Sequence, residues 1–219
     1  MNIVRPIARW LLPALSALLL AGCAETVIVG AGAAALLIGD RRPTETYLAD
    51  EGIEIRATNR IAERFGNRAH VNVTSYNRAV LLTGEVPDAA ARAEAEKIAA
   101  GVPNVKAISN ELEVAGVSSL SARSNDSFIT SKVKARFVDA NKFSATHVKV
   151  VTENGVVYLL GMVAQREADA AVEVARTTGG VRKVVRVFEI VSEAEIKRLD
   201  NPAGTPPPVG GQPASTPAK

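Results

Sequence analysis

Two segments of the chain repeat one pattern of hydrophobic and polar positions. Each begins with apolar residues at helical spacing, continues with two runs of β-branched residues, and ends with an alanine-rich helical run and a third β-like run. Matching positions such as Ile53 and Ile129 lie 76 residues apart in the first helix and 77 apart in the strands. This pattern predicts an α+β protein of two tandem domains, 50–114 and 125–192. Each domain is expected to be αββαβ, with a three-stranded mixed sheet covered by two helices.

Cap and turn residues suggest where the elements of each copy begin and end. Asn125 or Asp126 is expected to cap the first helix of the second copy. Asn154-Gly155 separates two β-branched runs and predicts a hairpin, because both turn positions need a positive φ. Gly84 and Gly161 are expected to end the second strands, where the chain must bend sharply.

The first 23 residues have the pattern of an export signal. Arg5 and Arg9 precede an apolar run, 10–20, which is too short to span a bilayer as a helix because a span needs about 20 apolar residues. The run ends in Leu-Ala-Gly-Cys, which resembles the bacterial lipobox. The resemblance implies that residues 1–22 are removed as a lipoprotein signal peptide. It also implies that Cys23 receives diacylglycerol on its thiol and a further acyl chain, such as palmitate, on its new amine.

The segment after the cysteine is predicted to be a lipidated N-terminus and small-residue linker, 23–49. Ala24 stands where the inner-membrane retention signal of enterobacterial lipoproteins has Asp, which implies the outer membrane with the domains facing the periplasm. The run 30–35, Gly-Ala-Gly-Ala-Ala-Ala, resembles a dinucleotide fingerprint. However, residues 40–43, Asp-Arg-Arg-Pro, would end its helix too early, so a nucleotide-dependent enzyme is disfavoured.

Composition excludes several function classes. The chain of 219 residues has a net charge of +3, and the signal peptide carries two of those charges, so bulk charge does not favour nucleic-acid binding. One cysteine and two histidines exclude an internal disulfide and a Cys/His zinc site of the usual ligand count. No catalytic motif is recognisable, so neither an enzyme nor a cofactor nor a metal is expected. Residues 115–124 are predicted to be a linker, and 193–219, rich in Pro and Gly, a disordered tail.

The second strands carry a family resemblance. Residues 80–84, Val-Leu-Leu-Thr-Gly, and 157–161, Val-Tyr-Leu-Leu-Gly, resemble the strand that closes with glycine in BON domains, as do the longer stretches 124–130 and 148–161. With the signal and the lipobox, the chain resembles outer-membrane lipoproteins with two BON domains. The resemblance implies phospholipid binding and support of envelope integrity without catalysis, and a link to the division site.

The first helix of the second copy carries the candidate site. If its apolar residues at helical spacing face the core, one flank presents an aromatic side chain beside lysine, a pattern typical of membrane interfaces. The candidate phospholipid-binding residues are Phe128, Ser131, Lys132, Lys134 and Ala135. The resemblance places a lipid-facing helix here, with Trp as the usual aromatic, whereas the first copy has Gly52 at the place of Phe128. The alternative is that Phe128 packs between the two domains.

The expected partner is therefore an anionic phospholipid membrane, and no nucleic acid. The alternative is a non-enzymatic adaptor that binds another envelope protein or peptidoglycan. An exposed stripe on a helix serves either purpose, so the sequence alone leaves both open.

Overall fold

The computed structural model describes residues 40–201 of the chain. The predicted signal peptide, Cys23, the fingerprint-like run 30–35 and the C-terminal residues from 202 onward lie outside the described residues. None of the helices within 40–201 is long and apolar enough to cross a membrane.

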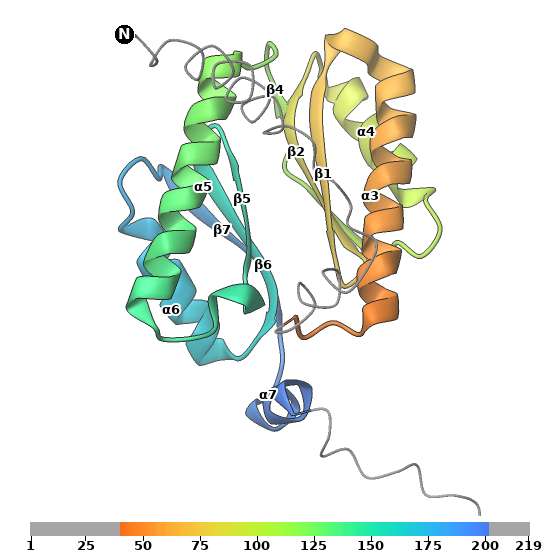
Figure 1. The fold of residues 1–219 in the computed structure, drawn as a ribbon. Coiled ribbons are helices and arrows are strands. Elements are labelled where there is room, and N and C mark those ends of the chain that lie inside the picture. The colour runs from red at the N-terminus through yellow and green to blue at the C-terminus, as the bar shows by residue number, and fades with distance from the viewer. Residues whose placement is uncertain (1–39, 202–219) are drawn as a thin grey trace, which may run out of the picture. The chain divides into compact units, whose positions relative to one another are not determined.

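Each copy has the predicted αββαβ order (Figure 1). The first copy consists of α3 (Thr44–Phe65), β1 (His70–Tyr76), β2 (Ala79–Val86), α4 (Ala89–Ala100), β3 (Ala107–Asn110) and β4 (Glu113–Val114). The second consists of α5 (Leu120–Ala140), β5 (Lys149–Glu153), β6 (Val156–Val163), α6 (Gln165–Arg176) and β7 (Lys183–Ile190). Short 3-10 turns, Gly66–Arg68 and Ala145–His147, lead into the first strand of each copy, and α7 (Glu193–Asp200) follows the second.

Both sheets are mixed, as predicted. β2 pairs antiparallel with β1 and parallel with β3, and β6 pairs antiparallel with β5 and parallel with β7. β3 and β4 are two pieces of one third strand, because Leu82 opposite Asn110 and Glu85 opposite Glu113 keep the same register. The break lies opposite Gly84, whose φ of 111° interrupts the regular strand.

The helices of each copy cover one face of its sheet, and the remaining sheet faces meet (Figure 1). In the first copy α3 buries Ile53, Ala57 and Ile61 against the strands at a spacing of four residues. The helix-free faces of the two sheets share an apolar cluster made of Tyr76, Leu81, Tyr158, Leu160 and Met162. The two copies therefore pack through a second, smaller core.

Gly84 and Gly161 lie inside their strands, so the prediction that they end the strands is wrong. A Cβ atom on Gly84 would overlap the carbonyl oxygen of His70, and one on Gly161 would overlap that of His147. Both glycines are needed because the backbone at the repeated histidine, at the start of β1 in the first copy and just before β5 in the second, passes too close for any side chain. The repeated glycine and the repeated histidine thus belong to one structural feature.

The first helices begin earlier than predicted. α3 starts at Thr44 and α5 at Leu120, so the predicted linkers end before residues 50 and 125. Asp126 is not the cap of α5, because Ser119 holds that position and its side chain accepts a hydrogen bond from the amide of Ala122. The prediction of a disordered tail is wrong for its first part, where Ser192 caps α7.

Asp126 instead holds the hairpin turn of the second copy. Its buried carboxylate accepts hydrogen bonds of 2.8 Å from the backbone amides of Asn154 and Gly155, which have φ of 47° and 71°. Asp50 does the same in the first copy, where it accepts from the amides of Asn77 and Arg78. The repeated aspartate is therefore a turn-holding residue that sits within its helix.

Candidate functional site

The predicted phospholipid-binding residues lie on the outer side of α5. Ile129, Val133 and Phe137 are buried against the second sheet. At about 100° per residue, Phe128 and Ala135 fall on the opposite side of the helix. Phe128 is 62% exposed, so the alternative that it packs between the two domains is wrong.

Lys132 lies against the ring of Phe128. Its Nζ is 4.8 Å from the ring centroid, within the range of a cation–π contact. The same ammonium donates a hydrogen bond to the carbonyl oxygen of Gly179, in the loop after α6. An ammonium has three donors, so Lys132 can hold this loop and still offer donors to an anion.

The other predicted residues differ in what they offer to a ligand. Ser131 donates its hydroxyl hydrogen to the carbonyl oxygen of Ser127, which leaves its oxygen as an acceptor. Ala135 is exposed and adds only apolar surface. Lys134 is exposed on the opposite flank of the stripe from Lys132, so the two lysines border it on either side.

Two further apolar side chains extend this stripe. Leu120 and Val138 are 75% and 65% exposed, and helical spacing puts both on the same side of α5 as Phe128. We call Leu120, Phe128, Ser131, Ala135 and Val138 the α5 stripe. Sequence reasoning missed its two ends, although extending the spacing of three and four residues along the helix would have found them.

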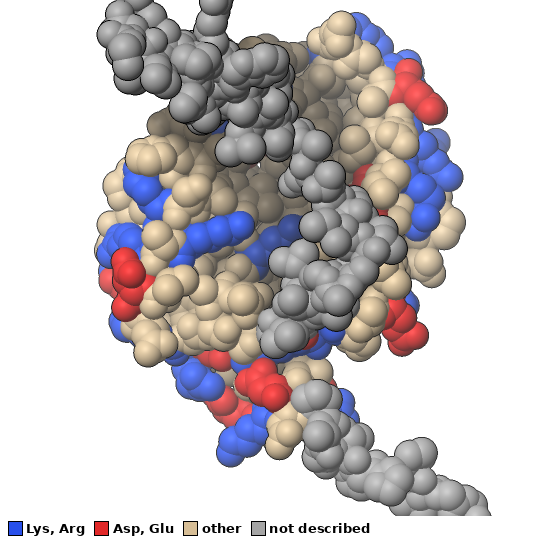
Figure 2. Space-filling view, viewed as in Figure 1, with Lys and Arg blue, Asp and Glu red and all other residues tan. Residues whose placement is uncertain are grey.

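The two first helices differ in charge. α5 carries four basic and two acidic residues, a net charge of +2, whereas α3 carries three basic and five acidic residues, a net charge of −2. The surface over α5 in Figure 2 shows Lys and Arg side chains among uncharged ones. Asp139, the exposed acid of α5, is outnumbered by the basic residues. The second copy therefore presents the helix that suits an anionic surface.

The residues just before α3 form a buried ionic network that the sequence did not reveal. Arg41 donates to both carboxylate oxygens of Glu167 at 2.7 and 3.0 Å, to those of Asp200 at 2.7 and 3.0 Å, and to the carbonyl oxygen of Met162 at 2.9 Å. Arg42 pairs with Asp50 at 2.8 Å. The segment from residue 40, predicted as linker, is thus fixed to both copies.

This network shifts the pKa values of its members. Burial raises the pKa of Glu167, but hydrogen bonds from Arg41 and from the amide of Ala164 outweigh it, and the pKa ends below its usual value. The hydrogen bond from Arg41 likewise lowers the pKa of Asp200. Burial and the charge of Arg41 lower the pKa of His147, whose Nε2 lies 3.9 Å from Asp200.

The two histidines lie in different surroundings. His147 borders the ionic network, whereas His70 stands beside Glu85 on the neighbouring strand. Within residues 40–201, one group of histidine and carboxylate side chains has the spacing of metal ligands, and it contains His70.

Comparison with known proteins agrees with the duplicated fold. The model of the BON domain matches residues 50–116 and 125–192. The chain is 40% identical over 172 residues to the outer membrane lipoprotein DolP of Haemophilus influenzae, a match that spans 78% of this chain and 89% of that protein. It is 38% identical over 154 residues to the 21 kDa hemolysin of Actinobacillus pleuropneumoniae, which spans 69% of this chain and 79% of that protein.

A further relative covers less of the chain. Osmotically-inducible protein Y of Escherichia coli is 35% identical over 117 residues, which spans 52% of this chain and 58% of that protein. The relatives place the chain among proteins with BON domains and an envelope role. The match to DolP supports its assignment as an outer-membrane lipoprotein. From the two matched domains and the identity over most of its length, the chain belongs to the BON-domain family as a two-domain member similar to DolP.

Proposed function

We propose that this protein is a lipoprotein, anchored in the outer membrane by acylated Cys23 with its domains in the periplasm. In this proposal the second BON domain binds anionic phospholipid through the α5 stripe and thereby supports envelope integrity, including at the division site. It acts without catalysis and without a nucleic-acid partner.

The observation that carries the proposal is the exposed ring of Phe128 with the ammonium of Lys132 against it. An aromatic side chain can enter the interfacial region of a bilayer while a neighbouring lysine stays with the headgroups. The basic flanks of α5 add attraction for anionic lipid, which the acidic α3 of the first copy lacks.

The expected strength of this contact is modest. Burying a phenylalanine contributes about 1.5–3 kcal/mol, and a basic residue near an anionic surface about 1 kcal/mol. Together, Phe128 and Lys132 would supply roughly 2–4 kcal/mol, which is at least tens-fold in affinity. Acyl chains on Cys23 would hold the domain at the membrane, so a weak contact suffices at the resulting effective concentration.

Vesicle sedimentation of the unlipidated chain, 24–219, tests the proposal. Wild type should bind vesicles that contain phosphatidylglycerol more tightly than vesicles of phosphatidylcholine alone. Phe128→Glu should lower binding to the anionic vesicles at least tenfold and leave the circular dichroism spectrum unchanged. Ile55→Glu is the matched control, because Ile55 is 60% exposed on α3 and its change should have little effect.

Equal binding of wild type and Phe128→Glu would refute the lipid role of the α5 stripe and favour the adaptor alternative. The anchor is tested separately in cells. Cys23→Ala should leave the precursor uncleaved and without acyl label, and unchanged labelling would contradict the lipoprotein assignment.

A further inference from the structure

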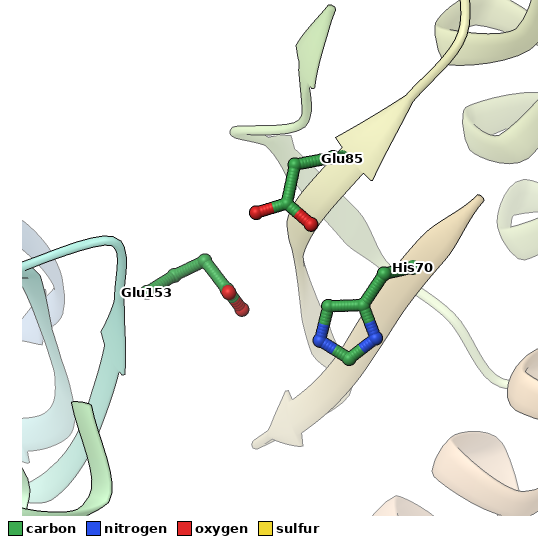
Figure 3. Close-up of side chains that lie close together, drawn as sticks. All are labelled: His70, Glu85 and Glu153. Carbon is green, nitrogen blue, oxygen red and sulfur yellow. The ribbon is translucent and has the colours of Figure 1, made fainter. Parts of the chain in front are cut away.

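Three side chains with metal-ligand chemistry meet where the two copies pack together. His70 begins β1, Glu85 on β2 is its direct partner in the antiparallel register, and Glu153 ends β5 of the second copy. Their ligand atoms all lie within 4.8 Å of one another. Figure 3 shows the three side chains converging on one space from the strands of both copies. We call these three residues the His70 cluster.

Hydrogen bonds fix the cluster in this arrangement. Glu85 accepts at Oε2 from the backbone amide of Ser118 at 3.1 Å, and Glu153 accepts at Oε2 from Nδ2 of Asn72 at 2.7 Å. The same Nδ2 lies 3.3 Å from Nε2 of His70, so Asn72 sits against two members of the cluster. Among the hydrogen bonds of residues 40–201, each carboxylate uses only Oε2, which leaves its Oε1 for another partner.

The two carboxylates are buried, and in the described part of the chain neither is paired with Lys or Arg. Glu85 and Glu153 are 5% and 7% exposed, and within residues 40–201 neither forms an ion pair with Lys or Arg. Burial raises the pKa of Glu153, and the charge of Glu85 adds to the rise although Asn72 and His70 oppose it. Two buried carboxylates at this separation repel each other unless one of them is protonated or a cation lies between them.

The duplication provides an internal comparison for this place. Equivalent positions of the two copies lie 77 residues apart here. Of the cluster residues, His70 is therefore equivalent to His147, Glu85 to Met162, and Glu153 to Tyr76. At the corresponding end of the interface, the two carboxylate positions are therefore taken by Met162 and Tyr76.

That corresponding end holds cations of the chain itself. Arg41 donates to the carbonyl oxygen of Met162 at 2.9 Å, and the guanidinium carbon of Arg42 lies 4.1 Å from the ring centroid of Tyr76. One end of the interface thus has arginines that are paired with carboxylates. The other end has two carboxylates and a histidine, and no arginine or lysine is paired to these carboxylates in the described part of the chain.

We propose that His70, Glu85 and Glu153 bind one divalent transition-metal ion, Zn²⁺ by their chemistry, which links the two BON copies. One imidazole nitrogen with two carboxylate oxygens suits Zn²⁺, which takes His and Asp or Glu ligands in tetrahedral sites and can complete its shell with water. Ca²⁺ and Mg²⁺ prefer shells made wholly of oxygen. One cysteine and two histidines are too few for a Cys/His zinc site, but this site needs only one histidine because its two other protein ligands are glutamates.

The geometry needs only a small adjustment. Ligand atoms around a tetrahedral Zn²⁺ lie roughly 3.3–3.6 Å apart, given metal–ligand distances of about 2.0–2.2 Å. The widest separation in the cluster is no more than 4.8 Å, so rotation of the two glutamate side chains can close it. His70 is half-buried, which gives an ion a route from solvent. Asn72, which donates to Oε2 of Glu153, would orient this ligand from outside the metal's own shell.

Calorimetric titration of the full-length, tag-free lipoprotein in detergent, after treatment with EDTA, tests this site with ZnCl₂. Wild type should bind one Zn²⁺ per chain, and Zn²⁺ should raise its Tm by several degrees. Glu153→Gln should lower Zn²⁺ affinity at least tenfold and abolish the rise in Tm. Its Tm without metal should equal or exceed that of wild type, because the change removes a buried like charge.

His147→Asn is the matched control, since His147 occupies the corresponding place of the second copy and should leave Zn²⁺ binding unchanged. Absence of stoichiometric binding of Zn²⁺ or Mn²⁺ by wild type would overturn the proposal. So would wild-type Zn²⁺ affinity in Glu153→Gln with an unchanged circular dichroism spectrum, or an equal loss of affinity in both variants. None of these outcomes bears on lipid binding by the α5 stripe, which vesicles test in the absence of metal.

Discussion

Replacing Arg41 with methionine tests whether the segment before α3 is an integral part of the fold. The side chains of Arg41 and Glu167 are 2% and 4% exposed, and all five guanidinium donors of Arg41 have acceptors. Methionine retains much of the apolar stem. Among the described residues, the buried carboxylate of Glu167 would then keep a hydrogen bond from the amide of Ala164 and a distant charge, Arg166 at 3.9 Å. Removal of one partner from a buried pair costs about 3–5 kcal/mol.

Urea unfolding of the unlipidated chain, followed by far-ultraviolet circular dichroism, measures this loss. With a slope of about 2 kcal/mol per molar urea, the midpoint should fall by roughly 2 M. Arg64→Met is the control, because Arg64 forms an equally direct pair with Glu94, at 2.5 Å, but both side chains are exposed. Its midpoint should stay close to that of wild type.

Equal midpoints for Arg41→Met and wild type would show that the ionic network does not stabilise the fold. A loss in Arg64→Met as large as that in Arg41→Met would show that burial does not determine what these ion pairs contribute to stability.

Two further predictions concern the backbone and pH. Gly161→Ala should lower the Tm sharply, because its Cβ would overlap the carbonyl oxygen of His147. Gly116→Ala is the control and should leave the Tm unchanged, because no atom lies within 4 Å of the added Cβ. Equal Tm values of the two variants in thermal scans would contradict the close approach at Gly161. The folded-state pKa values of Glu167, Asp200 and His147 all lie below their usual values. On acidification the unfolded chain therefore binds more protons than the folded one, so the free energy of unfolding should decrease as the pH is lowered. This loss should begin below about pH 6.5 through His147 and steepen below about pH 4.5 through the carboxylates, and urea midpoints that rise on acidification would contradict it.

Local patterns predicted the elements of this fold because each depends on nearby residues. The spacing of Ile129, Val133 and Phe137 fixes the buried side of α5, and therefore also the exposed side that carries Phe128. Asn154-Gly155 forms the expected hairpin because its two residues adopt the positive φ values that the turn requires. The helix order and the candidate face follow from such short-range constraints.

The residues that sequence reasoning misassigned act over long distances. Asp126 resembles a helix cap when only its neighbours are considered, but its partners are amides 28 and 29 residues away. Arg41 resembles the end of a linker, yet its partner Glu167 is 126 residues further along the chain. The proximity of the two carboxylates in the His70 cluster could not be predicted from the sequence either, because Glu85 and Glu153 meet only when the two sheets pack face to face.

The most direct test of the α5 stripe as the lipid-binding element uses nuclear magnetic resonance. The unlipidated chain would be mixed with anionic bicelles that contain a spin-labelled phospholipid, and the loss of amide signal would be measured residue by residue. Strong signal losses are expected along α5 from Leu120 to Val138, centred on Phe128, and little loss along α3. Signal loss centred on α3, or none on α5 while the chain is bound to the bicelles, would contradict it.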